Sequence, residues 1–156
     1  MSTSEATRID GSESQRAGRR RRRRLLAVMA AVVSAVVGWG LIESGAGVDL
    51  RAPAFDGSAI GQDIGLGAVI FTSLIGSLAA WGVLALLERH VGRPRRIWTV
   101  VALTGLLISL AGPMSGTGIG AGDRGLLALL HLVVAAVLIP LLYRTADIVN
   151  RTESPS

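Results

Sequence analysis

The chain alternates between charged segments and long stretches without any charged residue, and these stretches determine its predicted architecture. Uncharged runs cover residues 25–42, 64–87, 97–122 and 125–143. A bilayer core about 30 Å thick is crossed by about 20 helical residues, so each run is long enough to span a membrane. Lipid cannot hydrogen-bond the backbone, so the runs are predicted to be helices rather than open strands. The pattern predicts an all-α integral membrane bundle of four transmembrane helices.

The ends of the spans follow from local composition. The third run becomes rich in glycine after Met114, and Pro113 is expected to end that helix. The four predicted spans are residues 25–42, 64–87, 97–114 and 125–143. They lie in a transmembrane domain at 25–146, between a disordered basic tail at 1–24 and a second tail at 147–156. Disorder is expected near the N-terminus because Ser, Thr, Glu and Gly dominate there without an apolar run.

Arginine is concentrated on one side of this threading. All 16 basic residues are Arg: eight precede the first span, four lie between the second and third spans, and two follow the fourth. Only Arg51 and Arg124 lie on the other side, where the connection at 43–63 is expected to be a solvated acidic loop. Positive charge flanking spans stays in the cytoplasm. We therefore predict a multi-pass protein of the cell membrane with both termini cytoplasmic.

A run of six consecutive Arg residues precedes the first span. Its members are Arg19, Arg20, Arg21, Arg22, Arg23 and Arg24. The run is expected to act as a topology signal and to contact anionic headgroups of the lipid bilayer, worth about 1 kcal/mol per Arg. Nucleic acid is not expected as a partner, because no aromatic residue interleaves with the run.

Aromatic residues lie near three predicted span ends. Trp39, Trp98 and Tyr143 hold these positions, the last two beside Arg residues. Rings flanked by Arg are typical of the membrane interface, so these side chains are expected to anchor the spans there.

The composition excludes many kinds of chemistry. The chain contains no Cys and no Lys, which excludes disulfides, thiolate metal sites, cysteine nucleophiles and Schiff-base lysines. The Gly-rich stretch at 116–122 is expected to be a turn, since no strand precedes it and no Lys follows it. We therefore expect no catalytic residue, no cofactor and no metal site, and we predict that the protein is not an enzyme.

Small residues recur at helical spacing in three of the spans. The rows are Ala27, Ala31 and Ala35 in the first span, Thr72, Gly76 and Ala80 beside Ser73 and Ser77 in the second, and Gly105 and Ser109 in the third. Small residues let membrane helices approach closely. The sequence leaves open whether these rows close the bundle on itself or form the face of a homo-oligomer.

His131 is the one ionisable residue well inside a predicted span. Ionisable groups within a membrane are candidates for function. Counting inward at 1.5 Å per residue places Ser109, Thr72 and Ser73 close to its depth. An unpartnered imidazole would cost about 1–3 kcal/mol, so one of these hydroxyls, with Ser109 first, is expected to approach it. The four residues form a candidate intramembrane polar layer, and a purely structural role for His131 stays open.

The second half of the chain resembles a known family. The resemblance rests on Pro94-Arg95-Arg96-Ile97-Trp98, Ser109-Leu110-Ala111-Gly112-Pro113 and Leu129-Leu130-His131-Leu132-Val133-Val134-Ala135-Ala136. These segments resemble a family of small four-helix membrane proteins of actinobacteria known as a domain of unknown function. The resemblance implies the fold and the membrane location, and it implies no activity.

Two functional classes follow from these features. The short loops and the lack of catalytic groups favour a non-enzymatic interaction or accessory protein of the cell membrane, with a membrane protein partner or a second copy. The alternative is a small carrier or channel that uses His131 and the Ser/Thr polar layer. No acidic residue lies in a span, which weighs against the alternative because cation pathways usually contain one.

Overall fold

The computed structural model describes residues 3–46, 50–53, 61–115 and 117–146, without the side chains of residues 3–14 and 46. These residues form four helices and two short strands: α1 (Thr3–Ala46), β1 (Arg51–Ala52), β2 (Gln62–Asp63), α2 (Leu66–His90), α3 (Pro94–Ser115) and α4 (Ala121–Thr145). The predicted tail at 147–156 lies outside the described residues.

All four predicted spans are helical, and the all-α class is confirmed. Each of the four helices is long and apolar enough to cross a membrane. The predicted boundaries are close, although α2 begins after Gly65, two residues later than predicted. Pro94 opens α3, where its missing N–H costs no helical hydrogen bond.

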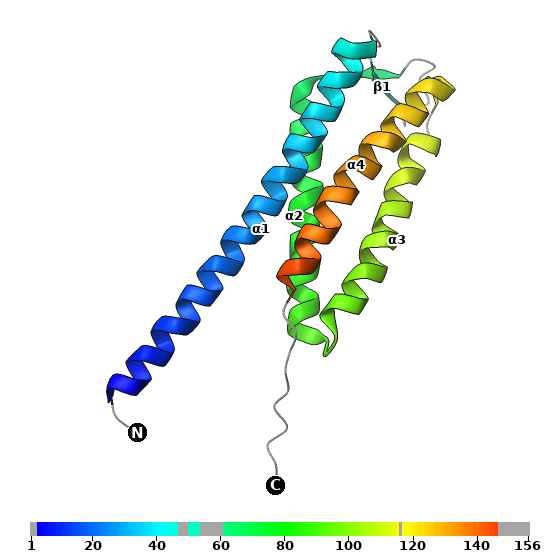
Figure 1. Cartoon of the computed structure of the whole chain (residues 1–156). Coiled ribbons are helices and arrows are strands. Elements are labelled where there is room, and N and C mark those ends of the chain that lie inside the picture. The colour runs from blue at the N-terminus through cyan, green and yellow to red at the C-terminus, as the bar shows by residue number, and fades with distance from the viewer. Residues whose placement is uncertain (1–2, 47–49, 54–60, 116, 147–156) are drawn as a thin grey trace.

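The helices run side by side, and α1 alone extends beyond the other three (Figure 1). α1 packs extensively on both α4 and α2, and α3 packs mainly on α4. α2 makes much less contact with α3 and α4. The bundle is therefore closed along α1 and left open between α2 and α3.

The two ends of the bundle differ in the elements and side chains that they contain. The β end holds the β1–β2 pair, the ends of α1 and α3, and the starts of α2 and α4. At the opposite end, here called the Arg24 end, the side chain of Arg24 meets Glu88 and Thr145.

The β end contains a strand pair that the sequence did not predict. β1 and β2 are antiparallel, with Arg51 opposite Asp63. Their ion pair, with Nε and Oδ1 3.2 Å apart, is exposed and so contributes at most about 1 kcal/mol. Gly61 fixes the approach to the α3–α4 turn, because its N–H donates to the carbonyl of Gly118 at 3.0 Å. An added Cβ at Gly61 would lie 2.6 Å from the Ala52 carbonyl oxygen, so no larger residue fits there.

The buried core is small and lies toward the Arg24 end. It consists of Ala27, Ala31, Leu84, Trp98, Leu138, Leu142 and Ala146. Much of the outer surface is apolar instead, with Leu41, Leu107 and Ile108 each more than two-thirds exposed. Water-soluble monomers rarely expose large contiguous apolar patches.

Two predicted boundaries differ from the structure. α1 begins at Thr3 rather than near Leu25; the tail contains no proline, and its Glu, Gln, Arg and Ala are good helix formers. α3 continues two residues past Pro113. The Arg124 guanidinium donates to the carbonyls of Pro113 and Met114 at 3.0 and 2.6 Å, which satisfies acceptors at the helix C-terminus.

Candidate functional site

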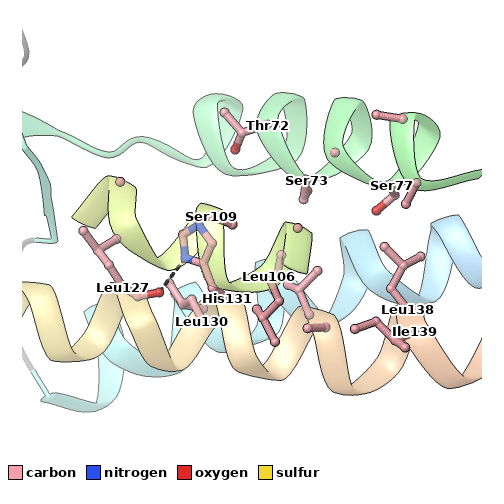
Figure 2. Close-up of a pocket in the computed structure, with 18 of the residues that line it drawn as sticks. Thr72, Ser73, Ser77, Leu106, Ser109, Leu127, Leu130, His131, Leu138 and Ile139 are labelled. Carbon is pink, nitrogen blue, oxygen red and sulfur yellow. Dashed lines mark hydrogen bonds between the residues drawn. The ribbon is translucent and has the colours of Figure 1, made fainter. Parts of the chain in front are cut away.

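A cavity of about 700 Å³ lies between α2 on one side and α3 and α4 on the other, and Figure 2 shows its interior. We call it the α2/α3 cleft. Small side chains from the facing helices line it, among them Gly76, Ala80, Ala102, Gly105 and Ser109. Of these, Gly76, Gly105 and Ser109 are exposed, so the cleft opens to the surroundings between α2 and α3.

The lining of the α2/α3 cleft contains no Asp, Glu, Lys or Arg, and His131 is its one ionisable residue. Among the residues that the structure describes, no three His, Cys, Asp or Glu side chains come together as metal ligands. The chemistry available in the cleft is therefore hydrogen bonding within an apolar wall.

His131 projects from α4 into the cleft, and its Nδ1 lies 2.7 Å from the carbonyl oxygen of Leu127. A carbonyl only accepts, so Nδ1 carries the proton and Nε2 of the neutral ring is an acceptor. Figure 2 shows this second nitrogen turned toward the side of the cleft where Thr72 lies. No hydrogen bond to Nε2 occurs within the described part of the chain.

The structure brings all four residues of the predicted polar layer to one cavity, since Thr72, Ser73, Ser109 and His131 all line the cleft. Figure 2 shows Thr72, Ser109 and His131 toward the same end of it. The expected hydrogen bond between the ring and a hydroxyl is absent among the described residues. The partner is a backbone carbonyl one turn earlier on the same helix, which needs no second helix to come close.

The hydroxyls of α2 behave in two different ways. Thr72 donates to the carbonyl of Ala68 at 2.7 Å, and Ser73 donates to the carbonyl of Val69 at 2.6 Å. Ser77, one turn deeper, is 1% exposed and its Oγ has no hydrogen-bond partner among the described residues. Figure 2 shows Ser77 pointing from α2 into the cleft, toward the end where Leu138 and Ile139 also lie. The sequence placed Ser77 in a packing row only, and nothing in its spacing signals an unpaired hydroxyl.

Trp98 lines the part of the cleft that borders the core. The sequence predicted it as an interface anchor, but its ring is 2% exposed and belongs to the core. Its indole N–H donates to the carbonyl of Ile139 at 3.4 Å.

A second polar cluster, the Arg24 cluster, lies at the Arg24 end and joins three helices. Arg24 is 5% exposed; its Nη2 donates to Glu88 Oε1 at 2.5 Å. Its Nε donates to Thr145 Oγ1 at 3.2 Å and its Nη2 also donates to the Thr145 carbonyl at 3.3 Å. Arg20 adds an ion pair to Glu88 at 3.7 Å. Arg24 is therefore part of the bundle, which differs from the prediction that the whole Arg19–Arg24 run contacts lipid.

Comparison with known sequence families shows to which family the chain belongs. Residues 15–148 match the sequence profile of a family of unknown function, DUF6069. The chain belongs to DUF6069. Comparisons with curated proteins and with solved structures give no match. The DUF6069 region begins before the Arg run and ends after α4, so it contains the α2/α3 cleft and the Arg24 cluster.

Membership in DUF6069 supplies no activity. The functional argument therefore depends on what the two polar sites of this chain can do. The Arg24 cluster pairs its charges with one another, which is the arrangement of a structural lock. The α2/α3 cleft instead presents unpaired hydrogen-bonding atoms in an apolar space, which is the arrangement of a binding site.

Proposed function

We propose that this DUF6069 protein is a non-enzymatic, multi-pass protein of the cell membrane that acts by interaction, and that the α2/α3 cleft is its binding surface. The observation that carries this proposal is the cleft itself. It is a cavity of about 700 Å³, within the range of about 300–1,000 Å³ that ligand sites occupy. Its opening lies between two helices that make little contact.

Membrane insertion is supported by the surface of the bundle. Four helices have the length and hydropathy of spans, and large apolar residues such as Leu107 and Ile108 are exposed. The Arg run of α1 and the Arg-rich turn between α2 and α3 lie at the same end. By the rule that positive charge stays inside, this end and both termini are cytoplasmic in the proposal.

The absence of catalysis in the proposal is supported by the bonding of the polar groups. A nucleophile needs a base within hydrogen-bond reach. Thr72 and Ser73 donate to carbonyls of their own helix, and the His131 ring bonds the Leu127 carbonyl. The described groups of the cleft are therefore arranged to hold a molecule rather than to activate one.

Topology is tested by single-cysteine labelling, for which the chain is suited because it has no Cys. We expect Ser44→Cys, at the β end, to react with an impermeant maleimide on intact cells. Gly92→Cys, in the α2–α3 turn, should react only after the cells are opened. Labelling of Gly92→Cys on intact cells would overturn the proposed orientation.

The binding surface is tested by photo-crosslinking in native membranes. A photoreactive amino acid at Val101, which lines the cleft, should yield a discrete adduct. The matched control is Val100, its neighbour in α3, which is 65% exposed and does not line the cleft. Equal or absent adducts at the two positions would contradict the cleft as the interaction surface.

A small carrier is the second candidate, favoured by one observation. His131, Ser109, Thr72 and Ser73 line the same cavity, as a polar path would require. Toward the Arg24 end this cavity borders the buried core that contains Trp98, so a carrier would need a second conformation. Proton flux into proteoliposomes that contain pyranine tests this candidate: a carrier predicts flux above empty liposomes that His131→Ala abolishes.

A further inference from the structure

We infer that the α2/α3 cleft holds an uncharged, chain-like lipid with two hydrogen-bonding groups about 10 Å apart along its length, one at His131 and one at Ser77. The inference rests on the proposed function, since it takes the cleft to be the binding surface and names its ligand. A partner helix is the competing occupant.

The length of the cleft favours a chain over a helix. Leu127 and Ile139 both line it and lie 12 positions apart on α4, which corresponds to about 18 Å. A helix that crosses the membrane is about 30 Å long, so it would extend well beyond the cleft. A hydrocarbon chain can begin and end within it.

The charge of the lining limits the ligand to an uncharged molecule. No carboxylate, ammonium or guanidinium group lines the cleft. Moving an isolated ionised group into such a space is very costly without a paired charge. A phosphate or carboxylate head would therefore stay outside the cleft.

The outer hydrogen-bonding point is Nε2 of His131. Because Nδ1 donates to Leu127, Nε2 is left to accept. The ligand group at this level must therefore be a donor, and a hydroxyl is the simplest donor on an uncharged lipid.

The inner point is the hydroxyl of Ser77, which is both donor and acceptor. Ser77 is buried without a partner among the described residues, although Ser73 on the preceding turn bonds its own helix. A buried hydroxyl left unpaired costs about 1–3 kcal/mol. A ligand oxygen beside Ser77 would remove that cost, which gives the bound state a specific advantage.

The two points are separated along the bundle. Figure 2 shows Ser77 toward the same end of the cleft as Leu138, and His131 nearer the other end. His131 and Leu138 lie seven positions apart on α4, a rise of about 10 Å. One head group cannot reach both points, so the ligand needs a polar group at each.

The test uses the full chain in phosphatidylcholine nanodiscs and a diazirine-bearing octadecane-1,9-diol as the probe. Its hydroxyls are separated by eight C–C bonds of about 1.5 Å in a zigzag, which span about 10 Å. We expect light-dependent labelling of α2 and α3 peptides that line the cleft. Unlabelled diol should compete about three- to tenfold better than octadecan-1-ol, and octadecyl phosphate should compete no better than octadecane.

Two substitutions assign the contacts. In Ser77→Ala and in His131→Phe, the diol should lose its three- to tenfold advantage over octadecan-1-ol. Ser77→Ala removes a buried hydroxyl without a described partner, so its thermal unfolding without ligand should occur at or above the temperature of the wild type. Ser34→Ala is the control, because Ser34 donates to the Ala31 carbonyl at 2.8 Å and does not line the cleft. It should leave all competition unchanged.

The outcomes separate this inference from the proposed function. If diol and octadecan-1-ol compete equally in the wild type, or if Ser77→Ala and His131→Phe retain the full advantage of the diol, the inference is overturned. If the probe fails to label the cleft while the photoreactive residue at Val101 captures a protein, the inference falls and the proposed function stands with a partner helix as occupant. If neither the diol probe nor the photoreactive residue at Val101 labels the cleft, both the inference and the proposed function are overturned.

Discussion

Two seams of this bundle contain the same kind of residue and differ in what those residues do. Along the α1 seam, where α1 packs on α4 and α2, Ala27 and Ala31 are at most 1% exposed, and an added Cβ at Gly38 would lie 2.7 Å from Leu130 Cδ2. Along the α2/α3 cleft, an added Cβ at Gly76 or Gly105 would meet nothing within 4 Å. Small residues thus permit close packing in one seam and keep space open in the other.

The difference shows that a row of small residues allows two helices to pack closely but does not by itself bring them together. Helices in lipid have no hydrophobic force between them, so close packing must be stabilised by van der Waals contact and polar groups. The α1 seam has such a polar group in Arg24, which reaches both α2 and α4. No hydrogen bond or ion pair that the structure describes joins α2 to α3 across the cleft.

The largest loss of stability is expected from disrupting the Arg24 cluster, which joins α1 to α2 and α4. Arg24→Met would remove the guanidinium that donates to Glu88 Oε1 and to Thr145, and should cost about 3 kcal/mol of the free energy of unfolding. Thermal unfolding in mild detergent measures it. Arg23→Met, at an exposed position, is the control and should change stability by less than about 0.5 kcal/mol. Equal losses of stability in both variants would show that the Arg24 cluster does not stabilise the packing of α1.

The next effect compares the two seams directly. Gly38→Val should cost about 1–3 kcal/mol, because its side chain would overlap Leu130. Gly105→Val should be close to neutral, since the space at Gly105 is open. Similar unfolding temperatures for the two variants would contradict the difference in packing.

A smaller effect is expected where α1 meets the start of α2. The indole N–H of Trp39 donates to the carbonyl of Ile64 at 3.0 Å. Trp39→Phe removes this hydrogen bond and keeps most of the aromatic surface, so it should cost about 1 kcal/mol. Chemical unfolding of the two proteins side by side measures the change, and no change at all would mean that the bond does not hold the two helices.

The smallest effect is a gain in stability from a substitution in the open cleft. Gly76→Ala should stabilise α2 by about 0.5–1 kcal/mol, because alanine restricts the unfolded chain and meets no neighbour. Unfolding of the ligand-free protein measures the gain. A loss of stability would indicate that the cleft closes around Gly76 in solution.

The sequence predicted the helices well because charge gaps report directly on segments of this length. It could not say which small-residue row packs and which stays open, because both rows contain the same residue types. It also treated Arg24 as one of six equivalent residues. The structure continues α1 through the run, which puts Arg24 on the face of Ala27 and Ala31 at helical spacing. A predicted first helix that began one turn before Leu25 would have placed Arg24 on this face.

The candidate site was predicted in part. His131, Ser109, Thr72 and Ser73 do line one cavity, and a single layer at one depth stays a prediction. The hydrogen bond of His131 to its own helix was not anticipated, because depth says nothing about side-chain rotamers. Ser77 was missed because an unpaired hydroxyl is a property of its neighbours.

The Arg24 cluster also imposes an order on biosynthesis. Translation produces α1 first, yet Glu88 follows Arg24 by 64 residues and Thr145 follows it by 121. Until the ribosome has passed α4, the first helix has neither its main packing partner nor all the acceptors of its guanidinium. A nascent chain that stops before α4 therefore leaves the Arg24 guanidinium without the Thr145 acceptors, beside an apolar segment that lacks its main packing partner.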